Sequence, residues 1–180
     1  MNAFTKEKAV VKLPKIIEQL KSRLVEEARI QAAQGGYSAV TVRSVAAACG
    51  VGVGTVYNYF SSKDELLAAF LLADWKDCMS RICWAGEDAA DAEPVLCCIY
   101  EELRGYLEKH RMVFRDEAAR KVFGGVIGKY HGLLRTQLAQ PLRRFCPDDF
   151  TAEFLAESLL TWTVEGRDPA QLIAVIKKVL

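Results

Sequence analysis

The chain has 180 residues, 51% of them hydrophobic and 26% charged, which excludes a disordered protein and indicates a globular one with a full hydrophobic core. Its formal net charge is only +1, but residues 1–63 hold nine Lys and Arg against four Asp and Glu, whereas residues 64–180 hold fifteen against nineteen. This asymmetry favours a nucleic-acid-facing module joined to a body that phosphate does not attract, over one compact domain.

Cysteine spacing and hydropathy indicate the cellular compartment to expect. The six cysteines show no Cys-x-x-Cys spacing and no nearby His pair, so we expect no metal site: Cys49, Cys78, Cys83, Cys97, Cys98 and Cys146. The start of the sequence has no signal-peptide core, and no window approaches 18 apolar residues, so we expect no membrane span. A reducing cytoplasm with free thiols is the expected location.

The N-terminal segment is basic and leads into a helix. Residues 1–15 carry Lys6, Lys8, Lys12 and Lys15, and predict an arm that is either a solvated tail or a further phosphate contact. From Ile16 to Gln34 apolar residues recur every three or four positions, which predicts a helix ending at Gly35-Gly36: Ile17, Leu20, Leu24, Ala28 and Ala32.

Residues 41–63 predict two short helices joined by a tight turn. Thr41 is a plausible N-cap for a helix over Val42 to Cys49, and Gly50 can adopt the left-handed conformation that ends it. A second helix follows over about Val53 to Tyr59. The small residues Ala46 and Gly50 permit close packing, and an apolar seam is expected from Val45, Val51, Val53, Val56 and Tyr59. This pattern predicts a helix-turn-helix whose second helix fits a DNA major groove.

Several runs in this stretch carry a family resemblance: Thr41-Val42-Arg43, Val45-Ala46, Gly50-Val51, Gly54 to Phe60, and Ser62 to Leu67. They resemble the DNA-binding domain of TetR-type transcriptional repressors, and Ala28 to Tyr37 fits the first helix of that domain. The match covers roughly residues 20–70 and is specific. It implies an all-α protein with a three-helix DNA-binding domain at residues 1–65 and a helical effector-binding and dimerisation domain at residues 66–180.

The resemblance also implies which residues meet DNA. Thr55, Tyr57 and Asn58 would lie at the bases, and glycines such as Gly54 would let the backbone approach the duplex. The backbone grip would come from Tyr59, Lys63 and the helix start Thr41, Val42 and Arg43, with a base edge as an alternative for Arg43. The structural alternatives are a core position for Tyr59, a simple cap for Thr41 and a solvated charge for Lys63.

The rest of the chain also follows helical patterns. Ser62 and Glu65 have the form of a capping box that opens a connecting helix reaching at least Ile82. Further helices are expected over Val95–His110, Val113–Leu142 with a weak point at the glycines of residues 124–128, Phe150–Val164 and Ala170–Val179. Asp168 and Pro169 are the expected N-cap and first residue of the last helix. No strand pattern is present, so eight or nine helices are expected.

By position, the body resembles the family's effector-binding domain, which implies a small-molecule effector of unknown identity. Candidate pocket residues are the larger side chains of the middle helices, for which an ordinary core position is the alternative: Trp75, Met79, Trp84, Tyr106, Phe114, Phe123, Tyr130 and His131.

Because one recognition helix reads only a few base pairs, proteins of this design bind as two-fold dimers with recognition helices about 34 Å apart. The last two helices are the candidate interface, following the family's four-helix bundle, and an intramolecular core is the rival explanation for their apolar stripes: Phe154, Leu155, Ser158, Leu159, Trp162, Leu172, Val175, Ile176 and Val179.

Enzymatic chemistry has no support in the sequence. The glycines at 50, 52 and 54 follow no strand, and the Gly125 to Lys129 run lacks the early glycine and the Ser or Thr of a phosphate-binding loop. His110 and His131 have no adjacent nucleophile with an orienting acid. We therefore predict no enzyme and no cofactor, but a homodimeric repressor that a small molecule releases from double-stranded operator DNA. The alternatives are an activator or thiol-sensing regulator of the same fold, or a helical small-molecule-binding or enzymatic protein that keeps the helix-turn-helix as a scaffold.

Overall fold

The computed structural model describes the backbone of residues 13–178 and the side chains of residues 19–123 and 131–178. Within that part every regular element is a helix, so the all-α prediction is confirmed. The helices are α1 (Leu13–Ala39), α2 (Val42–Cys49), α3 (Val53–Tyr57), α4 (Lys63–Glu87), α5 (Glu93–Lys109), α6 (Arg111–Arg115), α7 (Glu117–Ala139), the 3₁₀ helix η1 (Gln140–Phe145), α8 (Asp149–Val164) and α9 (Pro169–Ile176). The predicted basic arm lies outside the described side chains.

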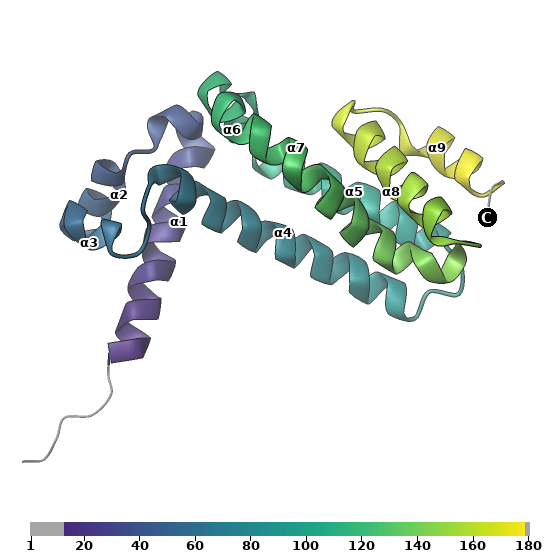
Figure 1. Cartoon of the computed structure of the whole chain (residues 1–180), viewed down its shortest axis with the longest axis horizontal. Coiled ribbons are helices and arrows are strands. Elements are labelled where there is room, and N and C mark those ends of the chain that lie inside the picture. The colour runs from purple at the N-terminus through teal and green to yellow at the C-terminus, as the bar shows by residue number, and fades with distance from the viewer. Residues whose placement is uncertain (1–12, 179–180) are drawn as a thin grey trace, which may run out of the picture.

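Helix α4 connects the two ends of the molecule (Figure 1). Helices α1 to α3 gather at one end, and α4 runs from there along α5 to the far end, where α8 and α9 lie. Ser62 caps α4 as predicted, because its Oγ accepts a hydrogen bond from the N–H of Glu65 at 3.1 Å. The Glu65 carboxylate reaches back to the N–H and hydroxyl of Ser61, at 2.7 Å each, rather than to Ser62.

Helix α1 is broken near its end at Gly36. The backbone there has φ 74° and ψ −169°, which glycine adopts without strain, and one further helical turn continues to Ala39. A Cβ atom at Gly36 would lie 2.8 Å from the main-chain oxygen of Met112. The predicted break is therefore correct in place, and it also lets α1 approach α6 closely.

The expected single helix from Val113 to Leu142 is wrong. The chain breaks at Asp116, whose extended backbone (φ −70°, ψ 122°) separates α6 from α7. The Asp116 carboxylate caps α7 by accepting from the N–H groups of Ala118 and Ala119, and it also accepts from the N–H of Ser38 at 2.7 Å. The Asp116 carboxylate thus joins the start of α7 to the end of α1.

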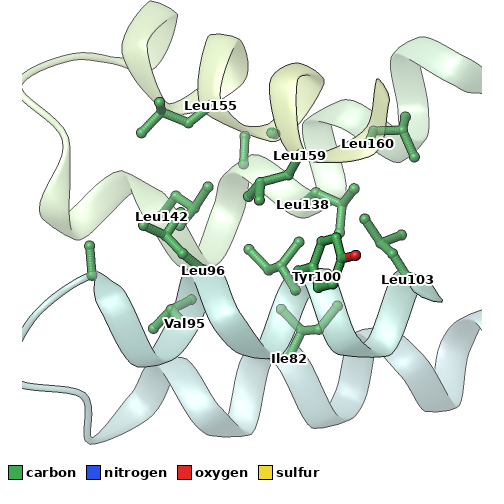
Figure 2. Close-up of a cluster of buried hydrophobic side chains, with 14 of the residues drawn as sticks. Ile82, Val95, Leu96, Tyr100, Leu103, Leu138, Leu142, Leu155, Leu159 and Leu160 are labelled. Atoms are coloured by element: carbon green, nitrogen blue, oxygen red, sulfur yellow. The ribbon is translucent and has the colours of Figure 1, made fainter. Parts of the chain in front are cut away.

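Two apolar clusters form the interior. The first, here called the head core, joins buried residues of α1 to α4 with one residue each from α6 and α7, and it includes Leu24, Ala28, Val45, Ala46, Val56, Leu66, Leu67, Phe70, Val113 and Ala119. The second, the body core, packs α4 and α5 against α7, η1, α8 and α9 (Figure 2), with labelled members Ile82, Val95, Leu96, Tyr100, Leu103, Leu138, Leu142, Leu155, Leu159 and Leu160. Helix α4 contributes to both clusters, which gives the two ends a shared rigid element.

Candidate nucleic-acid interface

Helix α2 begins and ends as predicted. The Ser44 N–H donates to the Thr41 hydroxyl at 2.9 Å and the Thr41 N–H donates to the Ser44 hydroxyl at 3.1 Å, a complete capping box. Gly50 closes the helix in the left-handed region, at φ 68°, with its N–H bonded to the oxygen of Ala47 at 3.1 Å. These local bonds fix the angle at which the chain enters α3.

Close packing of small residues holds α2 against α3. Three residues of this contact are at most 1% exposed: Val45, Ala46 and Val56. The prediction that Val53 joins this seam is wrong, because its side chain is 38% exposed. Helix α3 has only five residues, and a helix of about one turn presents a single position to its neighbour, here Val56.

The end of α3 differs slightly from the expected one at Tyr59. The helix ends at Tyr57, but Asn58 keeps a helical backbone (φ −70°, ψ −17°), and the N–H groups of Tyr59 and Phe60 both donate to the oxygen of Val56, at 2.9 and 3.0 Å. Phe60 is only 3% exposed and anchors this last turn in the head core. The second helix of the motif is therefore α3 plus one turn, anchored in the head core by Phe60.

The free surface of α3 combines two larger side chains, Val53 and Tyr57, with small or polar residues. Gly54, Tyr57 and Asn58 are exposed, and Thr55 is half-buried. A Cβ atom built on Gly54 would meet nothing within 4 Å. Packing within the described chain therefore does not require glycine at this position, whereas the close approach of an external backbone or base would.

The residues predicted to grip the DNA backbone lie in different environments. Arg43 is exposed at the start of α2, free to reach an external phosphate, and Thr41 is exposed with its hydroxyl engaged in the cap. The Val42 side chain is 9% exposed and belongs to the head core, so only its main chain is left for an external contact. Tyr59 is half-buried against the same core, which leaves both predicted roles open to it.

Lys63 makes contacts inside the protein. Its ammonium donates to the oxygens of Tyr37 and Val40, at 3.1 and 3.2 Å, and lies 3.6 Å from the centroid of the Tyr37 ring. Tyr37 in turn donates its hydroxyl proton to Asp64 at 2.6 Å. Burial, followed by the effect of Asp64, raises the pKa of Tyr37 to about 12. Lys63 thus supports the α1–α2 connection, whatever it also contacts outside.

Arg23 was missed by the sequence analysis. Its guanidinium donates to the oxygen of Cys49 at 3.1 Å, where α2 ends. A cation near the last carbonyls of a helix interacts favourably with the helix dipole, so Arg23 braces α2 from α1. A basic residue on a bracing helix is too common a feature to have identified this contact without the fold.

The predicted effector residues do not gather in one place. Trp75, Tyr106 and Phe114 form an aromatic cluster, with ring centroids 5.6 Å apart for Trp75–Tyr106 and 6.0 Å for Tyr106–Phe114. Its fourth member, His110, lies 4.7 Å from Tyr106 and was not selected as a pocket residue.

The remaining candidates are scattered. Trp84 is 75% exposed, Met79 is partly buried against the body core, and Phe123 packs edge-on against Tyr37 at 5.9 Å. His131 Nδ1 lies 3.6 Å from a carboxylate oxygen of Glu157. The side chain of Tyr130 lies outside the described residues.

The predicted dimer residues divide between interior and surface. Leu155, Leu159, Leu172 and Ile176 are at most 8% exposed and belong to the body core of the chain itself, which fits the intramolecular alternative for these four. Ser158 and Trp162 are half-buried, and Val179 lies outside the described residues. Four apolar side chains are more than half exposed, two of them predicted and two missed: Phe154, Val175, Phe150 and Val164.

None of the helices within residues 13–178 combines the length and apolarity that a membrane span requires. 

Comparison with known proteins shows which family the helix-turn-helix region resembles. The sequence model of the family described as bacterial regulatory proteins, tetR family, matches residues 24–70, from α1 to the first turns of α4. The repressor KstR of Rhodococcus jostii is 38% identical over 64 residues, and KstR of Mycobacterium tuberculosis is 43% identical over 51. The matched regions make up 36% and 28% of this chain, and the chain spans only 30% and 23% of the lengths of these relatives.

Solved structures extend the likeness to the whole fold. A transcriptional regulator from Pseudomonas aeruginosa superposes with a TM-score of 0.54 at 24% identity, covering 89% of this chain and 88% of that protein. The fatty acid degradation regulator FadR of Bacillus halodurans gives 0.54 at 20% identity, with 88% and 93% covered. Residues 24–70 are thus similar to the DNA-binding region of the tetR family of bacterial regulatory proteins, and the chain as a whole shares the helical fold of these solved regulators.

Proposed function

We propose that this chain is a cytoplasmic, homodimeric transcriptional repressor that binds double-stranded operator DNA through α3 and is released by a small molecule. The observation that carries the proposal is the surface of α3, where Tyr57 and Asn58 are exposed beside Gly54, a glycine that the chain's own packing does not need. No catalytic role is proposed for any residue.

The recognition helix suits the major groove by its size and its support. Tyr57 and Asn58 would meet base edges, while the missing side chain at Gly54 would let the α3 backbone approach the duplex. Arg43, exposed at the start of α2, would hold a phosphate and set the register. The capping box at Thr41 and the buried Val56 would keep this face rigid during the encounter.

The dimer would form through the exposed side of α8. Phe150 and Phe154 are 78% and 57% exposed, and their rings stack with centroids 6.4 Å apart. Val164 continues the apolar surface toward the end of the helix at 63% exposure. Large exposed apolar side chains on one helix are typical of an interface core, and a second copy of α8 would cover them.

A small-molecule effector is supported by what related folds bind. FadR of Bacillus subtilis, solved with stearoyl-CoA, superposes with a TM-score of 0.52 at 17% identity, and RolR, solved with resorcinol, with 0.51 at 22%. The thiol-sensing alternative receives no such support. Burial raises the pKa of the Cys78 thiol to about 12 and also raises the pKa values of Cys97 and Cys98, which disfavours their reactive thiolate forms.

The test is a mobility-shift screen of the full-length protein against genomic fragments, beginning with its own upstream region, at about 50 and about 200 mM salt with non-specific duplex as competitor. We expect a specific complex that weakens with salt. Tyr57→Ala and Asn58→Ala should each reduce specific affinity by about tenfold or more. The matched control is Trp84→Ala, which removes an exposed aromatic side chain from α4, far along the chain from α3. Absence of any specific fragment would refute the proposal.

A further inference from the structure

A pocket of about 160 Å³ lies where the head meets the body, between the second half of α1 and the α5–α6 junction. Figure 1 shows α6 beside the end of α1 at this place. Most of the wall is apolar, with Ile30, Ala33, Phe70 and Val113 among its residues. The polar part of the wall comes from Arg29, Lys109 and His110. None of the residues that the sequence analysis proposed for an effector lines this pocket, but His110 of its wall packs against Tyr106 and Phe114.

The polar side chains of the pocket surround one buried carboxylate. Asp74 on α4 has a side chain only 5% exposed. Arg29 approaches one of its oxygens at 3.0 Å, and Lys109 and His110 approach the other at 2.9 Å each. Burial, the largest effect on this ring, lowers the pKa of His110 to about 4, so His110 is neutral near pH 7. Two cations therefore share one buried anion.

Two buried nitrogen atoms of this wall have no hydrogen-bond partner among the described residues. They are Nε of Arg29 and Nε2 of His110. His110 Nε2 faces Asp74 Oδ2 at 2.9 Å, an oxygen that also has no hydrogen-bond partner among the described residues, and Arg29 Nε forms a longer ion pair with Glu26 at 3.5 Å. Glu26 is itself 56% exposed and is not part of the pocket wall. An unsatisfied buried donor is costly, and a ligand oxygen would remove that cost.

We propose that this pocket is an effector site for a small organic carboxylate whose apolar body is about the size of a benzene ring. A cavity of about 150 Å³ holds benzene, so the volume suits such a body. The carboxylate would pair with Arg29 and Lys109, while the apolar wall disfavours inorganic phosphate, which has no apolar part. The two cations of the wall disfavour a cationic ligand.

Binding here would act on the position of α1. Arg29 belongs to α1, and its contact with Asp74 of α4 ties the head to the body at 3.0 Å. A ligand carboxylate competes with Asp74 for Arg29 and Lys109, so occupancy changes the contacts that hold α1 against α4 and α5. This effector role rests on the proposed function as a DNA-binding repressor, whereas ligand binding itself does not.

The first arm of the test measures binding without DNA. Isothermal titration calorimetry of the full chain with benzoate, cyclohexanecarboxylate and hexanoate should show one site per chain for at least one of them, and benzamide should not bind. Lys109→Gln should weaken that binding at least tenfold, and Ala33→Trp, which fills the pocket, should abolish it. Lys121→Gln on α7 is the matched control, an exposed lysine paired with Glu117 outside the pocket, and should bind like the wild type.

The second arm measures operator affinity with and without the carboxylate that binds best. Reduced operator affinity in the wild type, lost in Ala33→Trp, supports the proposal. If no carboxylate of the three binds at up to roughly ten millimolar, the pocket proposal is overturned even where DNA binding is specific. If one binds but operator affinity does not change, the effector role is overturned. Failure of specific DNA binding in the ligand-free protein counts against the proposed function instead.

Discussion

The ammonium of Lys63 lies over the ring of Tyr37, 3.6 Å from its centroid, and donates to the main-chain oxygens of Tyr37 and Val40. The sequence resemblance assigns Lys63 to a DNA phosphate, but this arrangement gives it a structural role at the end of α1. Both roles are compatible only if the third N–H of the ammonium remains free for phosphate.

We expect Lys63→Met to lower the free energy of unfolding by about 1 to 2 kcal/mol, because it removes two charge-assisted hydrogen bonds and a cation–π contact at a partly buried site. Urea denaturation followed by circular dichroism measures this change. Lys121→Met, at an exposed ion pair, should change stability by less than about 0.5 kcal/mol. If Lys63→Met leaves stability unchanged yet weakens DNA binding, the ammonium acts only on phosphate.

A substitution at Gly54 tests whether DNA binding, rather than folding, requires glycine at this position. Because a Cβ atom there meets nothing within 4 Å and the residue lies inside α3, Gly54→Ala should raise the free energy of unfolding by about 0.5 to 1 kcal/mol. The same methyl group would stand on the proposed DNA-facing surface. We therefore expect specific operator affinity, measured by mobility shift, to fall while stability rises.

Gly105 offers a matched control within the same chain. It lies inside α5, and a Cβ atom there also meets nothing within 4 Å. Gly105→Ala should give a similar gain in stability without changing operator affinity. Equal DNA binding by the two alanine variants would show that Gly54 does not face the duplex.

The exposed side of α8 predicts a specific effect on assembly. Phe154→Glu introduces a charge into the proposed interface, so we expect the dimer dissociation constant to rise by at least about tenfold in sedimentation equilibrium. The side chain is 57% exposed, so the fold of the subunit should persist, as circular dichroism can verify. Leu72→Glu on α4 alters a side chain of similar exposure, 53%, and should leave the dimer intact. Dissociation by Leu72→Glu alone would place the interface elsewhere.

The elements that the sequence predicted well are those fixed by local chemistry. The cap at Thr41, the left-handed turn at Gly50 and the start of α9 at Asp168 each depend on bonds within a few residues. The break at Asp116 was missed although its cap is local, formed with the N–H groups of Ala118 and Ala119, whereas the bond that joins the break to α1 comes from Ser38, 78 positions away. The glycines near residue 125 were the apparent weak point, yet α7 continues through them.

Tertiary packing also decided which apolar residues face inward. The stripes of α8 and α9 are consistent with either an interface or a core, and only the packing of α5 and α7 against α8 shows that Leu155 and Leu159 are core. The same limit applies to Asp74. Its sequence neighbours give no sign that Arg29 and His110, one before and one after it in the chain, would meet its carboxylate.

His110 predicts a loss of stability in mild acid. Its pKa is lowered from 6.5 to about 4, chiefly because burial disfavours the charged ring, and the groups that face it include Asp74, Lys109 and Arg29. Between these two pKa values the unfolded chain binds more protons than the folded one, so stability rises with pH in that window. The contribution is fully present above about pH 6.5 and is lost as the pH falls toward 4, for a total of roughly 3 kcal/mol. Urea denaturation from pH 7 to 4 measures the slope, which should be shallower in His110→Leu whatever that variant's stability at pH 7. A slope in His110→Leu that equals the wild-type slope would contradict the prediction.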